Sequence, residues 1–200
     1  MKLICIGDSI TYGQGGSNEN INYPNILSKL LNCQVDNYGV KGSTICKNGS
    51  EDNQNKSIEN RVSTIDFKSY THCLIMGGTN DWANNFNLTS VYESLIKIFQ
   101  TIYVSNNNIE ILFFTPFYRN NWYKGDSNYN PNDNGIYLKE FVNVIIKCCL
   151  KNSVKCCDLY LVSGFNEINY KAYYVDGLHP NDDGYYKLTN VIYNRLQGVL

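Results

Sequence analysis

The sequence predicts an α/β fold in which three layers, α/β/α, are built around a five-stranded parallel sheet. Two observations lead to this prediction: short, almost continuously apolar runs recur along the chain, and segments with a helical spacing of apolar residues separate them. Strands without polar alternation are typical of a parallel sheet that helices cover on both faces. A chain of 200 residues, without an internal repeat or a linker, is expected to form one domain over residues 1–200.

The first predicted element is a buried strand over residues 2–6, which ends in Gly7. A helix follows over residues 23–31, with Pro24 in its first turn, where a proline is well tolerated. The remaining strands are expected at 34–38, 72–76, 109–115 and 154–159, and further helices at 91–103 and 136–150. A closing helix is expected from Asn181 to Leu200, capped by Asn181 or Asp182.

Two polar segments, residues 46–63 and 118–134, are long for connections in a compact domain. Either segment is a surface loop or a wall of a substrate cleft. The second segment favours the cleft because it carries four aromatic side chains, Tyr118, Trp122, Tyr123 and Tyr129. Glycines and polar residues also follow the predicted strands, at the sheet edge where α/β folds bind ligands.

The charge balance argues against two classes of partner. The formal net charge is −1, so the chain has no basic footprint for nucleic acid and no polybasic membrane patch. No run approaches the ~20 apolar residues of a membrane helix, and residues 3–6 are far too short for the apolar part of a signal peptide. We therefore predict a cytoplasmic protein, with a leader removed from a longer precursor as the alternative.

The eight cysteines are predicted to be free thiols in a reducing compartment. The adjacent pairs at 148–149 and 156–157 do not match the spacing of zinc sites, and only two histidines are present. Cys5 and Cys73 lie in apolar runs, where cysteine behaves as a small hydrophobic residue. Asparagine is abundant and tyrosine occurs 17 times, which fits either a coding bias or a surface that binds sugars.

Asp176 precedes His179 by three residues, and Pro180 favours an extended backbone at His179, so the pair belongs to a loop. A carboxylate there can accept from Nδ1 and leave Nε2 as a base. Ser9 directly follows the first strand and is the candidate nucleophile, which needs such a base. Each feature alone is more often an ordinary turn.

Four segments together resemble the SGNH (GDSL-like) lipase/esterase family. Residues 7–11 (GDSIT) resemble its first block, 37–44 (NYGVKGST) its second, 77–81 (GGTND) its third and 176–180 (DGLHP) its last, in the family's order. The resemblance spans nearly the whole chain and implies the flavodoxin-like fold of that family. An α/β-hydrolase is the less favoured host because the sequence around Ser9 lacks the G-x-S-x-G elbow.

The resemblance implies a role for each matching residue. Ser9 would be the nucleophile, His179 the general acid and base, and Asp176 its orienting carboxylate. The backbone N–H groups of Ser9 and Gly42 and the side-chain amide of Asn80 would form the oxyanion hole. Two other carboxylates near the site are interpreted as structural, Asp8 in the turn around Ser9 and Asp81 as a partner of backbone amides.

The sequence thus predicts hydrolysis of a carboxylic ester through an acyl-serine intermediate, without a cofactor or a metal. The substrate is expected to be a carbohydrate ester or another small-molecule ester with a small acyl group such as acetyl. Candidate substrate contacts are Trp82, Tyr118 and Trp122. A lipase, a thioesterase and an acyltransferase with the same triad remain alternatives, as does a non-catalytic carbohydrate-binding protein. The sequence does not indicate the oligomeric state.

Overall fold

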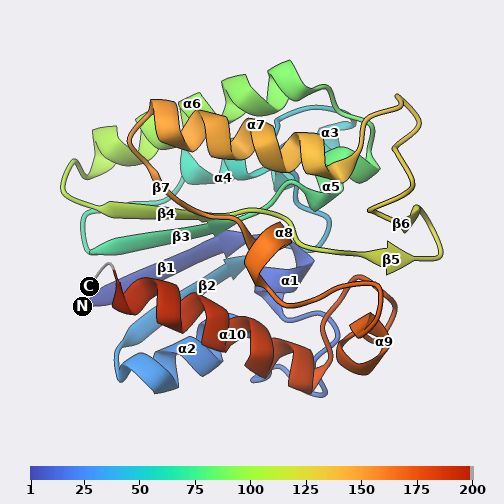
Figure 1. Ribbon diagram of the computed structural model, residues 1–200. Coiled ribbons are helices and arrows are strands. Elements are labelled where there is room, and N and C mark those ends of the chain that lie inside the picture. Colours follow the sequence, from blue (N-terminus) through green and yellow to red (C-terminus); the bar gives the residue numbers. More distant parts are fainter. Residues whose placement is uncertain (199–200) are drawn as a thin grey trace.

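Five parallel strands form the central sheet of the computed structural model, which describes residues 1–198 (Figure 1). In sequence order these strands are β1 (Lys2–Gly7), β2 (Gln34–Gly39), β3 (His72–Met76), β4 (Glu110–Phe114) and β7 (Lys155–Cys157). Their order across the sheet is β2-β1-β3-β4-β7, and every neighbouring pair is parallel. This is the flavodoxin-like strand order. The chain adds β2 on one side of β1 and the later strands on the other side, so the strand order reverses between β1 and β3. The predicted fold class is confirmed.

Helices cover both faces of the sheet (Figure 1). One face carries α4 (Ile58–Val62), α6 (Leu88–Ser105) and α7 (Leu138–Lys151), whereas α2 (Tyr23–Leu31) and α10 (Asp182–Gln197) cover the other. The sheet therefore separates two apolar clusters, and each strand must contribute to both. This requirement explains why the strands read as continuous apolar runs.

Strand β1 illustrates how one run of apolar residues serves both layers. Ile4 and Ile6 pack into the cluster that includes α6 and α7, and Leu3 and Cys5 pack into the cluster that includes α2 and α10. All four side chains are fully buried. Alternate side chains of a strand point to opposite faces, so a polar residue at any of the four positions would lie in one core or the other.

Most predicted elements lie within two residues of their observed bounds. The helix predicted at 91–103 begins three residues earlier, at Leu88, because the Asn87 side chain caps it by accepting from the N–H of Ser90. The last strand is shorter than predicted because the Asp158 side chain caps α8 (Leu159–Val162), accepting from the N–H of Leu161. The closing helix begins where expected, with Asn181 as its cap and Asp182 as its first residue. Residues 199–200 of the predicted helix lie outside the described residues.

The sequence patterns missed the short helices. The segment at 46–63, predicted as a long loop, contains α3 (Glu51–Lys56) and α4, each capped at its start by a serine side chain. The other short helices are α8, α1 (Ser9–Tyr12), α5 (Thr79–Ala83) and α9 (Tyr170–Tyr173). The segment at 118–134 contains a small hairpin of β5 (Asn120–Asn121) and β6 (Gly125–Asp126). Helices of one turn are too short to show a helical period.

All eight cysteines within residues 1–198 are free thiols in the structure. Six are buried, and Cys33 and Cys156 are half-buried. Burial raises the pKa of the Cys148 and Cys157 thiols to about 11, so these groups are protonated and unreactive at neutral pH. Within the same described residues, none of the helices is long and apolar enough to cross a membrane.

Candidate active site

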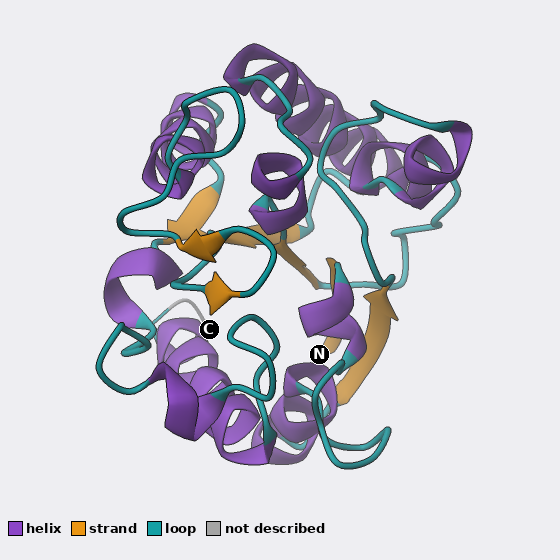
Figure 2. Ribbon diagram, turned by 90° about the vertical axis from the view of Figure 1, so that its right-hand side faces the viewer, coloured by secondary structure: helices purple, strands orange, loops and turns teal. Residues whose placement is uncertain are grey.

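The carboxyl ends of the central strands meet at one edge of the sheet, shown facing the reader in Figure 2. Ser9 follows β1 as the first residue of α1, and Asn80 follows β3 in α5. Gly42 lies three residues beyond the end of β2. The crevice between β1 and β3 is the topological switch point of this strand order, where open α/β sheets bind their ligands. Three predicted site residues therefore come from three adjacent strand ends.

A chain of hydrogen bonds connects the three predicted triad residues. Ser9 Oγ lies 2.9 Å from Nε2 of His179, and Nδ1 of the same ring lies 2.7 Å from Oδ2 of Asp176. The carboxylate can only accept, so Nδ1 carries the ring proton and Nε2 accepts from the Ser9 hydroxyl. Ser9 and His179 are buried, with 5% and 8% of their surfaces exposed. This arrangement can remove a proton from Ser9 as its oxygen attacks.

The turn before α1 fixes the position of Ser9. Asp8 Oδ1 accepts from the N–H of Ile10 at 2.9 Å, so Asp8 caps the helix that begins with Ser9. A side chain at Gly7 would collide with the hydroxyl of Thr11, so the turn requires glycine there. Burial raises the pKa of Asp8 to about 7, against the hydrogen bond from Ile10. Asp8 thus has the structural role that the sequence indicated.

The loop of Asp176 and His179 is held by its own carboxylate and by the hairpin. Asp176 Oδ1 accepts from the N–H groups of Leu178 and His179, at 3.0 and 2.8 Å. Burial disfavours the carboxylate, but the hydrogen bonds from His179 and Leu178 outweigh it and lower the pKa of Asp176. The N–H of Asn120 donates to the carbonyl of Gly177 at 2.7 Å. Because Gly177 has φ +80° and a side chain would collide with Asn120, only glycine fits there.

A hydrogen bond joins Asn80 to the loop after β2 that carries Gly42. Gly42 has φ +74°, and a Cβ atom built on it would meet nothing within 4 Å, so its backbone borders open space. Asn80 Nδ2 donates one of its two N–H groups to the carbonyl of Ser43 at 2.8 Å. This bond places the amide next to Ser43, the residue after Gly42, and leaves its second N–H for another acceptor.

Asp81 anchors the continuation of that loop. Its two carboxylate oxygens accept from the N–H groups of Ile45 and Cys46, at 2.8 and 3.0 Å, and the side chain is fully buried. Burial raises the pKa of Asp81, although the two amide hydrogen bonds oppose this shift. The carboxylate is therefore a partner of backbone amides, as the sequence indicated.

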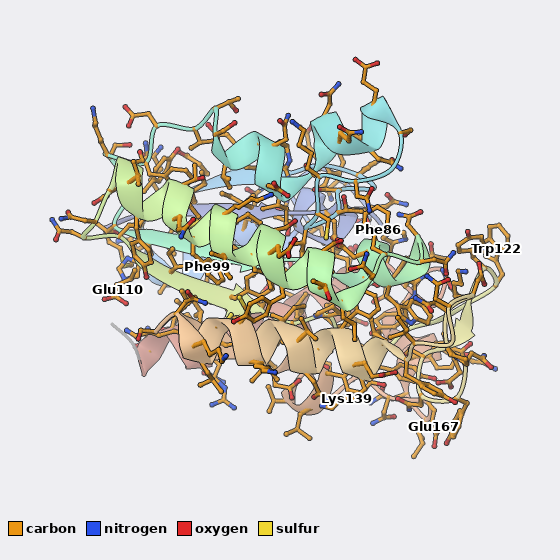
Figure 3. All side chains as sticks on the ribbon, turned by 90° about the horizontal axis from the view of Figure 1, so that it is seen from above. Phe86, Phe99, Glu110, Trp122, Lys139 and Glu167 are labelled. Atoms are coloured by element: carbon orange, nitrogen blue, oxygen red, sulfur yellow. The ribbon has the colours of Figure 1, made fainter. Side chains whose placement is uncertain are left out.

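Two of the three predicted substrate contacts are buried side chains in the structure. Trp82 is fully buried, and its Nε1 donates to the carbonyl of Ile136 at 2.9 Å. Tyr118 is 2% exposed, and its hydroxyl donates to Asp126. Both aromatic rings can be buried in the interior, because the indole N–H of Trp82 and the hydroxyl of Tyr118 each have a hydrogen-bond partner. Trp122 is 91% exposed and lies at the outer end of the loop (Figure 3), so its contact with a substrate stays a prediction.

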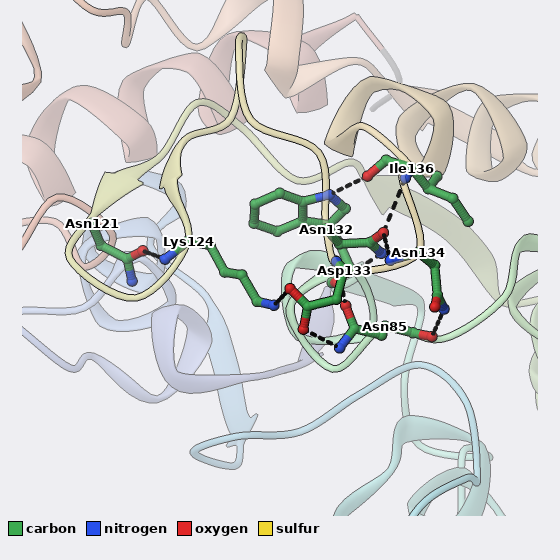
Figure 4. A network of polar contacts seen from close by, with 8 residues as sticks. Asn85, Asn121, Lys124, Asn132, Asp133, Asn134 and Ile136 are labelled. Atoms are coloured by element: carbon green, nitrogen blue, oxygen red, sulfur yellow. Dashed lines mark hydrogen bonds and ion pairs between the residues drawn. The ribbon is translucent and has the colours of Figure 1, made fainter.

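Side-chain contacts tie the loop at 118–134 to the rest of the molecule (Figure 4). Lys124 Nζ lies 2.9 Å from Asp133, and the N–H of Asp133 donates to the Asn85 side chain at 2.9 Å. Asn85 Nδ2 in turn donates to Asp133 at 2.9 Å. These contacts connect both halves of the loop to each other and to Asn85, just after α5.

Three side chains near the triad were not among the predicted site residues. Arg119 is 2% exposed and donates to Thr79 Oγ1 at 2.8 Å, and its Nε is the one buried side-chain polar atom without a partner in residues 1–198. Gln14 Nε2 lies 3.5 Å from Nδ1 of His179. Arg61 binds several carbonyls around Gly42. Nothing in the sequence distinguishes these arginines from exposed ones, because burial of a charge depends on partners remote in sequence.

Removing the Asn80 amide tests the oxyanion-hole prediction. We expect Asn80→Ala to lower kcat about 100- to 1,000-fold on p-nitrophenyl acetate, because one donor to the developing oxyanion is lost. The lost hydrogen bond to Ser43 is expected to cost only about 1 kcal/mol of unfolding free energy. Steady-state kinetics and thermal unfolding measure both effects. Asn84→Ala, on an exposed asparagine that ends the same helix, is the matched control. An unchanged kcat in Asn80→Ala would contradict the role.

Comparison with known proteins gives a family and several structural neighbours. The model of the GDSL-like Lipase/Acylhydrolase family matches residues 5–187. A search of curated proteins gave no match. A Lactobacillus plantarum structure is 22% identical with a TM-score of 0.85, covering 100% of this chain and 97% of that chain.

Two neighbours have functional descriptions. A "carbohydrate acetylesterase family member" from Sinorhizobium meliloti is 15% identical with a TM-score of 0.74, over 98% of both chains. An inhibitor-bound "Aryl Esterase" of M. smegmatis is 16% identical with a TM-score of 0.76, over 100% of this chain and 99% of that chain. At such identities these likenesses show the fold alone.

Proposed function

Because the chain belongs to the GDSL-like lipase/acylhydrolase family and is a serine ester hydrolase, we propose that it removes a small acyl group, acetyl, from a carbohydrate. The observation that carries this proposal is the contrast between two cavities near Ser9. One is apolar and very small, and the other is polar and large. An ester with a short acyl group and a bulky polar alcohol matches that contrast.

We assign the chemical steps of ester hydrolysis to the triad and to the candidate oxyanion donors. Ser9 Oγ attacks the ester carbonyl carbon while His179 Nε2 takes its proton, and Asp176 stabilises the resulting imidazolium. The carbonyl oxygen becomes an oxyanion that accepts from the N–H groups of Ser9 and Gly42 and from Asn80. The C–O bond to the alcohol then breaks, and His179 returns the proton to the leaving oxygen. Water repeats the sequence on the acyl-serine and releases the acid.

The small cavity supports a short acyl group. It has a volume of about 10 Å³ and is lined by residues next in sequence to the proposed catalytic ones, among them Ile10, Thr79 and Leu178. Met76 and Phe117 are among its apolar lining residues. A volume near 10–15 Å³ is about the room of one water molecule. It therefore suits the methyl group of an acetyl ester and leaves no room for a long chain.

The large groove supports a carbohydrate alcohol. It has a volume of about 560 Å³, and Gln14, beside His179, and Lys41, which immediately precedes Gly42, both line it. Tyr12 offers a half-exposed ring, with the Lys41 ammonium 4.8 Å from its centroid. The rest of the lining is rich in polar groups: Asn18, Glu19, Asn22, Asn25 and Asn37. Aromatic rings and amides are suited to the C–H faces and hydroxyls of a sugar.

A panel of substrates tests the proposal. We expect kcat/KM for p-nitrophenyl esters to fall steeply from acetate to octanoate, because the small cavity cannot hold a longer chain. We also expect an acetylated monosaccharide to be hydrolysed with a higher kcat/KM than ethyl acetate, because only the sugar fills the groove. A preference for octanoate over acetate would contradict the short acyl group and favour a lipase.

A variant in the groove separates the two halves of the proposal. Tyr12→Ala should lower kcat/KM for the acetylated sugar while leaving that for p-nitrophenyl acetate nearly unchanged. Tyr186→Ala is the matched control, since Tyr186 is similarly exposed, at 49% against 52%, but lies on α10. Equal effects of Tyr12→Ala on both substrates would contradict sugar binding in the groove and leave the acetyl specificity standing.

A further inference from the structure

The Arg61 side chain joins four separate acceptors around the candidate oxyanion hole. Its Nη2 donates to the carbonyl of Gly7 and to Oγ of Ser43, both at 2.9 Å. Its Nη1 donates to the carbonyl of Tyr38 at 2.7 Å, and its Nε donates to the carbonyl of Lys56 at 2.9 Å. Four of the five N–H groups in the guanidinium fork are thus engaged.

These acceptors lie at the segments that present the candidate oxyanion donors. Gly7 ends β1, two residues before Ser9, and its carbonyl also accepts from the N–H of Val40 at 3.0 Å. Tyr38 lies at the end of β2, and Ser43 directly follows Gly42. Arg61 therefore spans the two chain segments whose N–H groups must point at the same oxygen.

Arg61 holds these segments from behind the site. It lies in α4, and its side chain is largely buried among carbonyl groups and the Ser43 hydroxyl. Burial lowers the pKa of Arg61 to about 10, with Asp8 opposing the shift, so the guanidinium stays charged at neutral pH. A charged donor makes stronger hydrogen bonds than a neutral one and is costly to leave unpaired.

We propose that Arg61 is a positioning residue of the esterase, which sets the distance between the N–H groups of Ser9 and Gly42 without touching the substrate. The proposal rests on the proposed oxyanion-hole roles of these two residues. It does not depend on whether the natural alcohol is a sugar. Donors to an oxyanion act through their preorganised geometry, so a displacement of about 1 Å between them costs about 100-fold in rate.

Other contacts hold the same loop farther along the chain. Asp81 binds Ile45 and Cys46, and the N–H of Ile58 donates to the carbonyl of Thr44 at 2.8 Å. These contacts would keep the loop folded after loss of Arg61. We therefore expect variants at Arg61 to fold and to differ mainly in turnover.

The experiment compares Arg61→Ala and Arg61→Lys with the wild type on p-nitrophenyl acetate. Arg61→Ala is expected to lower kcat about 100-fold with KM little changed, because a transition-state interaction is lost. Added guanidinium chloride, below denaturing concentrations, should restore part of that kcat, while sodium chloride should not. The kcat of Arg61→Lys should remain close to that of Arg61→Ala, because a single ammonium cannot reach all four acceptors that the planar guanidinium binds.

Two control variants separate positioning from stability. Val62→Ala removes buried contacts of the same helix without removing a hydrogen bond of Arg61. Lys97→Ala removes a cation that pairs with Glu59 on that helix. Both are expected to keep the wild-type kcat below their unfolding temperatures, even where the midpoint falls as far as in Arg61→Ala.

Three outcomes would overturn the inference: a wild-type kcat in Arg61→Ala, an equal loss of kcat in Val62→Ala at matched stability, or no rescue by guanidinium. The failure of the proposed function is distinguishable from these. A wild-type enzyme that cleaves p-nitrophenyl acetate but no acetylated sugar contradicts the carbohydrate proposal and leaves the role of Arg61 standing. A wild-type kcat in Asn80→Ala contradicts the role of the Asn80 amide and leaves the role of Arg61 to be decided by the Arg61 variants, because Arg61 acts on the Ser9 and Gly42 segments.

Discussion

Replacement of Ser9 by alanine is expected to lower kcat for p-nitrophenyl acetate by about a million-fold, to the level left by binding and the oxyanion donors alone. The reason is geometric. Ser9 Oγ is the atom that His179 Nε2 accepts from, and alanine leaves the base without a nucleophile to activate. The fold should persist, since one hydrogen bond contributes only about 1 kcal/mol to stability. Initial rates and circular dichroism measure the two effects.

A covalent probe makes the Ser9 prediction independent of substrate. A fluorophosphonate should label the wild type at Ser9 and fail to label Ser9→Ala. Ser69→Ala is the matched control, because Ser69 is exposed and its hydroxyl accepts from the Lys2 ammonium at 3.3 Å, with no base beside it to activate it. Labelling of Ser9→Ala at the wild-type rate would show that another residue is the nucleophile.

The layers of the fold were predictable because the pattern that marks them is local. Strands such as β1 and β3 contribute side chains to both apolar clusters, so nearly all of their residues are apolar and the runs stand out in the sequence. The β2 strand is only partly buried along its length, yet its position between a helix and Gly39 was enough to place it. One-turn helices such as α1 and α5 carry no such signal, although they hold Ser9 and Asn80.

The candidate site could be predicted where chemistry and sequence position coincide. Ser9 and Asn80 follow strands β1 and β3, His179 lies three residues after Asp176, and a short motif that contains a glycine marks each of them. The supports of the site could not be predicted, because they act across the fold. Arg61 reaches Gly7 over 54 positions, and no local pattern encodes that contact.

The burial of the aromatic residues could not be predicted, for a related reason. Trp82 and Tyr118 looked suited to a substrate because of their neighbours in sequence, but each ring is buried and its polar tip is satisfied within the protein. A tryptophan or tyrosine can complete a core as readily as it can contact a ligand. By contrast, Tyr12 lines the polar groove, but nothing in the sequence distinguishes it from the other tyrosines as a substrate contact.

Replacement of Asp176 by asparagine is expected to lower kcat about 10,000-fold with little effect on KM. Asparagine can keep Oδ1, which accepts from Leu178 and His179, so the loop should retain its shape. Its NH₂ group then faces Nδ1 in place of Oδ2 and can only donate. The ring must therefore hold its proton on Nε2, and that nitrogen cannot accept from Ser9. The steady-state rate on p-nitrophenyl acetate, with Asp183→Asn on the exposed first turn of α10 as control, measures the effect.

The same variant has a pH signature in stability. Hydrogen bonds from His179 and Leu178 outweigh burial and lower the pKa of Asp176 in the folded protein, so its carboxylate stabilises the fold above the pKa of the unfolded chain. That contribution is lost as the pH falls through the folded pKa. The difference in thermal midpoint between wild type and Asp176→Asn should therefore be largest near neutral pH and shrink in acid. A variant that keeps a tenth or more of the activity would show that something other than Asp176 sets the tautomer of His179, and a pH-independent difference in midpoint would show that its carboxylate charge does not stabilise the loop.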